Sequence, residues 1–513
     1  MLSETLYFWL NIIALNLIKS NIDSLVAALL GTVIIISLTQ HSGLGISPDS
    51  IYYMSAADSF LAGKGFYQFD NKPFVMFPVF YPFVLSGLKW LFGNYLQITP
   101  YYNALLFGIT IFFSGAMLEK TNHVKWVKWI VLLLITLSPS LLEIYTMLWS
   151  ETLFVTEIVI FIWLCKKYFE TYQLKHLLII AAVSAIVANT RLAGISVIAT
   201  GGILILMSHD LQWSKKLKHA FVYGFVSISL FVINLIRNAT LSHTLTGNRQ
   251  KGVTPFLENL KYYGLVISDW LPFSSWTSLF PVLLGGLFLL IIGGIFMYRF
   301  LRKIEHNSYE KIAATFTLMY SAFMLIVATI SRFETINNRL LSPFYIPFLF
   351  TISFYIVGML KLGFSNTVKF VLKVTMLLLS FVAILTYAKR YTATYHENNQ
   401  GGIGGYTDDD WRVSSGLLNH LKSNSGLFKT NQTIYSNAAH AVYLYTQQHI
   451  QILPERKYPQ LVSEFNENPS PILIWFSNED NPEVLTMEEV QKTKKLQIIC
   501  KFNDGVIYQC TSK

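Results

Sequence analysis

Long apolar runs recur along most of this 513-residue chain, and they limit its fold more than any other feature. A run of about 18 or more apolar residues is long enough to cross a bilayer as a helix. Only 13% of the residues are charged, whereas soluble proteins have roughly a quarter. The runs therefore predict a polytopic α-helical membrane protein.

We expect about eleven transmembrane helices. They are predicted near residues 20–40, 99–117, 127–142, 150–165, 175–190, 192–208, 219–237, 278–299, 312–331, 343–361 and 369–388. Residues 5–18 form a shorter apolar stretch, for which an interfacial position is favoured over a span. The first apolar run is not followed by a small-residue cleavage site, so we do not expect a removable signal peptide.

Lysine and arginine gather in alternate loops, which fixes the expected topology. These basic loops are 119–128, 165–175, 208–218, 298–311 and 361–369. The positive-inside rule assigns them to the cytoplasm, and it assigns everything after Lys389 to the outer side of the plasma (inner) membrane. Loop charges of this kind account for the net charge of +10, so no nucleic-acid partner is predicted.

The first outer loop, about 41–98, is long and contains two candidate helices. They are PDSIYYMSAADSFLAG and PVFYPFVLSGLKWLFG, both amphipathic and rich in aromatic residues. Such helices suit the membrane surface. Pro48 fits the first turn of the earlier helix, and Asp49 lies in that same turn. Asp49 is either an ordinary helix-start acid that interacts with the helix dipole or a functional carboxylate at the membrane edge.

The composition changes after residue 388. We expect residues 1–388 to form the transmembrane domain, 389–410 a linker, and 411–513 an extracytoplasmic soluble α/β domain. Helical patterns at 411–423 and 438–447 alternate with strand patterns at 432–437, 451–455 and 471–477, before a closing hairpin at 496–510. Cys500 and Cys510 flank this hairpin and could pair if its turn is centred on Gly505, whereas a two-residue turn would break that register.

Several local motifs resemble bacterial membrane glycosyltransferases of the C superfamily (GT-C), which include the protein O-mannosyltransferase-like enzymes and the lipid A aminoarabinose transferases. The matching stretches are PDSIYYMSAADSFLAGKGF, FPVFYPFVLSGLKWLFG, LSPSLLEIYTMLWSETLF, NTRLAG and NNRLLSPFYIP. The resemblance implies a polyprenyl-phosphate sugar donor, an acceptor that binds from the outer side, and Asp49 as the base. Relatives often carry adjacent acids or a histidine in the first loops, whereas Ser50 follows Asp49 here. The need for a divalent metal therefore stays open.

Sugar transfer from a lipid phosphate needs a base for the acceptor hydroxyl and cations for the leaving phosphate. Arginine suits phosphate because it binds in a bidentate manner. The candidate substrate-binding residues at outer span ends are Glu151, Arg191, Arg237, Arg332 and Arg339. The alternative for each arginine is an interaction with lipid head groups.

The sequence thus predicts a cell-envelope glycosyltransferase whose acceptor is a lipid, glycan or protein, with membrane lipids around it. The alternative is a transporter or flippase of lipid-linked sugars. Transporters usually show internal repeats and charges near the bilayer midplane. Neither feature is apparent in this sequence, which favours the enzyme.

Overall fold

The computed structural model describes residues 19–121, 124–271, 279–303, 308–332, 334–424, 426, 432–479 and 481–513. The stretch 5–18, expected at the membrane interface, lies outside them. The chain divides into two compact units. Unit 1 comprises Met1–Gln40, Val75–Tyr81 and Gln97–His396, and unit 2 comprises His41–Phe74, Pro82–Leu96 and Glu397–Lys513.

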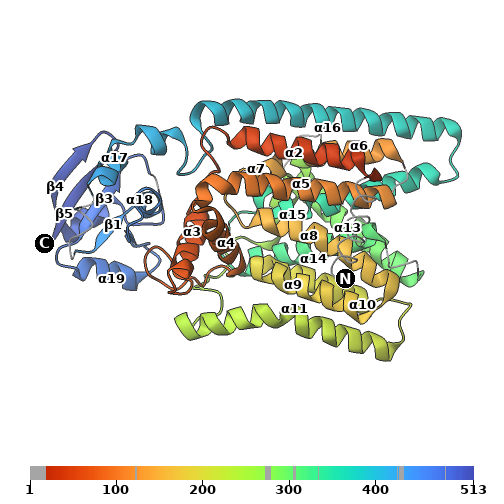
Figure 1. Ribbon diagram of the computed structural model, residues 1–513, viewed down its shortest axis with the longest axis horizontal. Helices are drawn as coiled ribbons and strands as arrows, with labels where there is room; N and C mark the ends of the chain where they lie inside the picture. Colours follow the sequence, from red (N-terminus) through yellow and green to blue (C-terminus); the bar gives the residue numbers. More distant parts are fainter. Residues whose placement is uncertain are drawn as a thin grey trace, which may run out of the picture. The chain divides into compact units, whose positions relative to one another are not determined.

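Unit 1 is a helical bundle (Figure 1). Its helices are α2 (Ile22–Thr39), α5 (Tyr95–Thr121), α6 (Lys125–Thr136), α7 (Pro139–Tyr145), α8 (Glu151–Thr171), α9 (Leu174–Thr190), η1 (Leu192–Gly194), α10 (Ile195–Leu206), α11 (Trp213–Ser242), α12 (Phe256–Trp270), α13 (Phe280–Leu301), α14 (Tyr309–Ile330), α15 (Asn338–Lys361) and α16 (Asn366–Gly401). Helices α5 and α16 begin or end in unit 2. Apolar composition makes helix the favoured conformation, because a helix satisfies its own backbone hydrogen bonds in lipid.

Seven helices of the described residues are long and apolar enough to cross a membrane, namely α2, α5, α11, α13, α14, α15 and α16. The bent pair α6 and α7, with an angle of 46°, would make eight. The expected count of about eleven is therefore not confirmed, although every expected segment contains helix. Helices α9 and α10 have 17 and 12 residues, which gives lengths of about 25 Å and 18 Å. Helix α8 is 21 residues long, but it is not among the seven because it carries several charged residues, among them Glu151 and Glu157.

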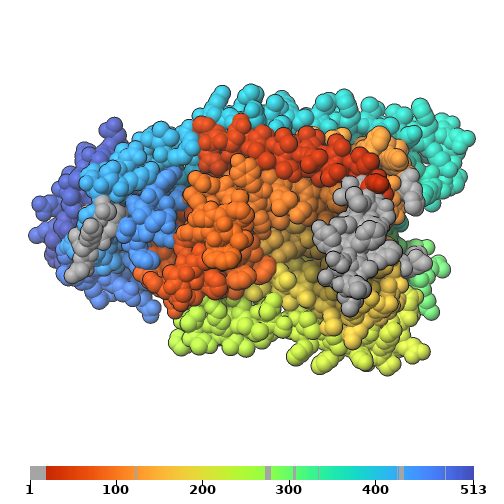
Figure 2. Space-filling model, viewed as in Figure 1, coloured from red at the N-terminus to blue at the C-terminus, as the bar shows by residue number. Residues whose placement is uncertain are grey.

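The apolar helices differ in how much of their surface is covered. In α15, 72% of the most apolar 18-residue stretch is buried, whereas in α16 only 6% of the corresponding stretch is buried. Helices α11 and α16 lie at opposite edges of unit 1 in the view that Figures 1 and 2 share. Their exposed apolar side chains suit contact with lipid, while α15 belongs to the core of the bundle.

Unit 2 contains the helices of the first outer loop and a small sheet domain, as expected from the sequence. Its elements are α3 (Pro48–Leu61), α4 (Phe80–Phe92, which begins in unit 1), η2 (Asp410–Ser414), α17 (Gly416–Ser423), β1 (Ile434–Ser436), α18 (Ala439–Thr446), β2 (Gln451–Ile452), α19 (Pro459–Glu467), β3 (Ile472–Phe476), α20 (Met487–Thr493), β4 (Lys494–Phe502) and β5 (Gly505–Ser512). The strand order is β2-β1-β3-β5-β4. Strand β1 pairs in parallel with β2 and β3, and β5 is antiparallel to β3 and β4.

The first outer loop and the end of the chain pack together inside unit 2. The Tyr406 N–H donates to the Ile46 carbonyl at 2.8 Å, and the Thr407 hydroxyl donates to the Leu44 carbonyl at 3.1 Å. The Gln451 side chain donates to the Asp70 carbonyl at 3.2 Å. Helix α16 runs on to Gly401, through the first half of the segment 389–410 that the sequence predicts as a linker.

The closing hairpin keeps its cysteines apart. Cys500 is opposite Ile507 and Cys510 is opposite Leu496, and both thiols are free. The turn between β4 and β5 has two residues, and the register shifts between Ile498 and Cys500. Of the two alternatives left open by the sequence, the broken register is the one present.

Candidate functional site

Glu151 begins α8, directly after a short connection from α7. An acid in the first turn of a helix is stabilised by the positive end of the helix dipole. The carboxylate is nevertheless enclosed, since only 1% of the side chain is exposed. A buried carboxylate needs partners that replace water, because an unpaired buried charge is costly.

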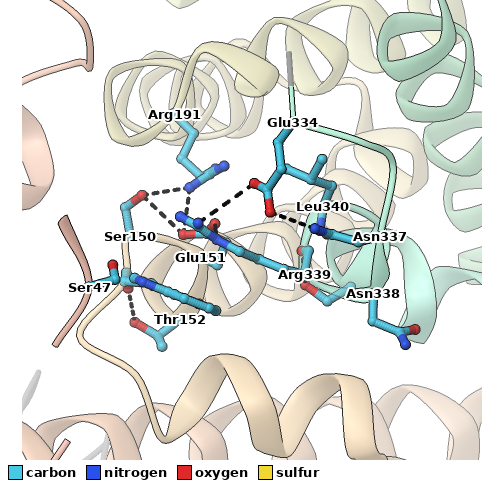
Figure 3. Close-up of polar contacts among 12 residues, drawn as sticks. Ser47, Ser150, Glu151, Thr152, Arg191, Glu334, Asn337, Asn338, Arg339 and Leu340 are labelled. Atoms are coloured by element: carbon cyan, nitrogen blue, oxygen red, sulfur yellow. Dashed lines mark hydrogen bonds and ion pairs between the residues drawn. The ribbon is translucent and has the colours of Figure 1, made fainter. Parts of the chain in front are cut away.

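Arg191 supplies the first partner from the break between α9 and η1. Its backbone is extended, with φ −145° and ψ 146°, so the chain leaves the helix at this residue. One guanidinium nitrogen, Nη1, lies 2.5 Å from Glu151 Oε2 and 2.8 Å from Ser150 Oγ (Figure 3). The helix break thus places a cation beside the start of α8.

Arg339 supplies the second partner from the first turn of α15. The Asn337 side chain caps that helix by accepting the Leu340 N–H at 3.0 Å. Arg339 Nε then donates to Glu151 Oε1 at 2.6 Å (Figure 3), and the guanidinium lies 3.9 Å from the centre of the Trp149 ring. Such cation–π contact fixes the plane of the guanidinium.

Trp149, Ser150, Glu151, Arg191 and Arg339 are called the Glu151 cluster below. Its one buried carboxylate faces two guanidinium groups, and a second acid, Glu334, lies 3.9 Å from Arg339 but is 52% exposed. Arg191 Nε is buried and has no hydrogen-bond partner within the described part of the chain. A guanidinium has five N–H donors and no acceptor. The cluster can therefore bind an anion without giving up its internal ion pairs.

Glu157 and Asn189 are two further buried polar residues, and Asn189 lies two positions before Arg191 in the sequence. Glu157 lies six residues after Glu151 in α8, and its carboxylate accepts the Thr190 hydroxyl at 3.0 Å. The second oxygen of Glu157 and the side-chain oxygen of Asn189 are buried without a partner among the residues that the structure describes. We did not select Glu157 from the sequence, where it looked like one acid inside an apolar helix. The motif NTRLAG, which contains Asn189 and Thr190, is the sequence feature that points to this region.

A second ion pair supports the start of α15. Arg390 donates to both oxygens of Asp269, at 2.7 and 3.0 Å, and the Asn338 amide donates to the same carboxylate at 3.0 Å. The Trp270 ring nitrogen donates to Asn338 Oδ1 at 2.9 Å. These contacts tie the residue before Arg339 to α12 and α16. No sequence pattern points to these contacts, because the partners lie far apart along the chain.

Arg237 and Arg332 have other neighbours. Arg237, near the end of α11, donates to Asn238 Oδ1 at 3.0 Å. Arg332 is exposed and donates to Gln250 Oε1 at 2.8 Å. In the described part of the chain, Glu151 forms ion pairs with Arg191 and Arg339. Of the five predicted substrate-binding residues, the structure thus brings three together in one cluster.

Asp49 lies in unit 2, in the first turn of α3, and its side chain is partly exposed. Pro48 occupies the first position of this helix, as expected. Ser47 and Ser50 form the capping box, and the Ser47 N–H donates to Ser50 Oγ at 3.0 Å. These serines satisfy the start of α3, so the helix has a cap that does not depend on Asp49.

No three His, Cys, Asp or Glu side chains gather closely enough to hold a metal ion in the described ranges. Glu151 is engaged by two arginines. The possible divalent metal remains a prediction.

No protein-family model matches this sequence, and no curated protein does. Solved structures do match. ArnT from Cupriavidus metallidurans in the apo state aligns with a TM-score of 0.56 and 13% identity, over 94% of this chain and 97% of that one. The same protein bound to undecaprenyl phosphate gives 0.54 and 13%, over 95% and 97%. The archaeal oligosaccharyltransferase AglB from Archaeoglobus fulgidus, in complex with an inhibitory peptide and a dolichol-phosphate, gives 0.52 and 12%, over 88% and 69%. At these identities the likeness is one of fold.

Proposed function

The fold is that of the GT-C superfamily of membrane glycosyltransferases, and from it we propose that this chain transfers a sugar from a polyprenyl-phosphate donor to an acceptor hydroxyl. The reaction is proposed to take place on the extracytoplasmic side of the plasma membrane. Asp49 is the general base, and the outer-face arginines bind the donor phosphate.

The Glu151 cluster carries the proposal. Two guanidinium groups, 13% and 17% exposed, converge on one buried carboxylate. An isolated arginine at a span end would be explained by lipid head groups. Two arginines held by a shared buried acid are oriented before any anion arrives, which reduces the free energy needed to order them on binding.

The charge change of the reaction explains why cations are useful. The donor phosphate is a diester with one negative charge. When its bond to the anomeric carbon breaks, the bonding electron pair goes to the phosphate oxygen, and the polyprenyl phosphate leaves as a monoester with up to two charges. Two guanidinium groups beside the phosphate therefore stabilise the transition state and product more than the bound donor, which is the condition for catalysis.

Asp49 is proposed to take the proton of the acceptor hydroxyl as the hydroxyl oxygen bonds to the anomeric carbon. Direct displacement inverts that carbon, and the transition state has oxocarbenium character, as in glycoside hydrolysis. The carboxylate is partly exposed and its helix is capped by serines. Asp49 is therefore not needed to cap the helix, which supports its proposed role as the base.

The carrier lipids of similar folds support the donor class. The ArnT structure holds undecaprenyl phosphate, and the AglB structure holds a dolichol-phosphate. We extend this chemistry to the present chain as a polyprenyl phosphate.

The test uses the full chain, purified and placed in lipid nanodiscs. Undecaprenyl-phosphate sugars are added with candidate acceptors, and released undecaprenyl phosphate is measured with and without chelator. Asp49→Asn is expected to abolish transfer while binding of undecaprenyl phosphate persists. Asp410→Asn, an exposed acid in unit 2, is the matched control and should transfer at the normal rate.

Two results would count against the proposal. Transfer at an unchanged rate by Asp49→Asn would reject this residue as the base. Movement of lipid-linked sugar across the bilayer without any transfer would instead favour the flippase alternative.

A further inference from the structure

Unit 2 contains a cavity of about 540 Å³. Its wall comes from α3 and the loop after it, from Lys89 of α4, and from three residues around the end of α18, Tyr443, Gln447 and His449. Small-molecule sites in proteins usually measure about 300–1,000 Å³. The cavity is thus large enough for one or two sugar rings.

The cavity wall contains a paired acid and base. Asp58 Oδ1 accepts Lys89 Nζ at 2.7 Å, and Asp58 Oδ2 accepts the Tyr95 hydroxyl at 2.8 Å. Because this acid and this lysine cancel each other, the interior does not have the excess of cations that a phosphate ligand needs. Lys64 adds a positive charge at the exposed rim.

The polar groups of the wall can both donate and accept hydrogen bonds. Gln68, Asn71 and Gln447 contribute side-chain amides, each with an oxygen acceptor and two N–H donors. Ser59 also lines the cavity, and its hydroxyl is buried without a hydrogen-bond partner among the described residues. Sugar hydroxyl groups likewise donate and accept, so they match this set better than a ligand with acceptors only.

Aromatic rings form the apolar part of the wall. Tyr67, Phe69 and Tyr443 line the cavity, and the rings of Phe69 and Tyr443 lie 5.4 Å apart. A sugar ring has an apolar C–H face that packs on aromatic surfaces, while the tyrosine hydroxyl remains available for polar contact.

The loop that carries Tyr67 to Asn71 is held in place before any ligand binds. His449 Nδ1 donates to the Phe69 carbonyl at 2.7 Å, and the Gln68 N–H donates to the Lys72 carbonyl at 2.8 Å. Asn71 adopts the left-handed conformation, with φ 62°, that this tight turn requires. A wall fixed in this way lowers the cost of ordering on binding.

We propose that this cavity binds a saccharide, by packing its C–H face on the aromatic rings and its hydroxyl groups on the side-chain amides. The proposal depends on unit 2 alone. It stands whether or not the chain transfers sugar from a lipid carrier.

The test is saturation-transfer difference NMR on the full chain in nanodiscs. The probes are glucose, galactose, mannose, N-acetylglucosamine, maltose and chitobiose. We expect at least one of them to receive magnetisation from the protein. Gln68→Ala and Tyr67→Ala should each raise the dissociation constant of that probe about tenfold, since one removes an amide and the other a ring.

The controls separate this proposal from misfolding and from the proposed function. Gln448→Ala changes an amide next to Gln447 that does not line the cavity, and it should bind as the parent does. Asp49→Asn should also bind as the parent does, because binding is measured without donor lipid. Thermal unfolding checks that Gln68→Ala and Tyr67→Ala remain folded.

Two outcomes would overturn the proposal. One is that none of the six probes receives magnetisation. The other is that folded Gln68→Ala and Tyr67→Ala both bind with the affinity of the parent, because the saccharide would then lie elsewhere.

Discussion

Glu151→Gln is the most informative substitution in unit 1, because it removes one charge and almost no volume. The carboxylate is 1% exposed and contacts Arg191 at 2.5 Å and Arg339 at 2.6 Å. The amide can still accept one hydrogen bond. Two guanidinium groups are left facing each other with their shared counter-charge removed.

The expected loss of stability follows from these contacts. A pair of unit charges about 4 Å apart interacts by about 4 kcal/mol at an effective dielectric constant of about 20. Removing one partner of a buried pair costs about 3–5 kcal/mol in measured cases. Unit 1 has roughly 350 residues, so at about 2.1 cal/mol/K per residue this loss lowers Tm by about 4–7 °C.

The assay is thermal unfolding of both proteins in nanodiscs, with and without undecaprenyl phosphate. A ligand at about 100 times its Kd stabilises the folded state by about 2.7 kcal/mol. The variant has one negative charge fewer beside the two arginines, while Glu334 still lies 3.9 Å from Arg339. We therefore expect the lipid phosphate to bind the variant about tenfold more tightly and to raise its Tm by more than that of the parent.

Glu334→Gln is the matched control. Glu334 lies 3.9 Å from Arg339 and is 52% exposed, so its loss should cost less than about 1 kcal/mol. The reasoning would be refuted if Glu151→Gln unfolded at the temperature of the parent. It would also be refuted if undecaprenyl phosphate stabilised the parent and not the variant.

Three further predictions concern single side chains. Arg339→Lys keeps the charge but loses the Nε contact and the Trp149 stacking, so undecaprenyl phosphate should bind about tenfold more weakly by titration; equal binding would contradict this. Burial lowers the pKa of His440 from 6.5 to about 4, and its Nε2 is buried without a hydrogen-bond partner among the described residues. Since the fold favours the neutral ring, its contribution is complete above pH 6.5, and up to about 3 kcal/mol is lost as the pH falls through 4; unfolding midpoints of His440→Phe should lack this dependence. Finally, iodoacetamide in denaturant without reductant should label both Cys500 and Cys510. If the two cysteines were bonded, neither would be labelled.

The transmembrane character and the fold could be predicted because they depend on composition that is continuous along the chain. The grouping of Glu151, Arg191 and Arg339 could be anticipated in part, since the loop charges assign all three residues to the same side. Their common position in one cluster depends on the break at Arg191 and on the start of α15. A hydropathy pattern does not encode either feature.

Other features needed the three-dimensional structure. The expected count of about eleven spans is not confirmed, in part because α9 and α10 are apolar but contain only 17 and 12 residues. The support from Asp269 and Arg390 joins residues 121 positions apart. The packing of residues 41–74 with 397–513 in unit 2 is also long-range. The periodicity of a sequence indicates which face of a single helix or strand is apolar. It does not indicate which distant segments pack together.

The short helices α9 and α10 have a consequence for the surrounding lipid. Leu178 and Leu206 are 42% exposed on them, so these helices present apolar surface over a height of only about 18–25 Å. A bilayer core of about 30 Å compensates for such hydrophobic mismatch by local thinning. Because Arg191 lies where these two helices meet, we expect water and head groups to dip toward it. A lipid carrier would then reach the guanidinium without lifting its chain out of the hydrocarbon.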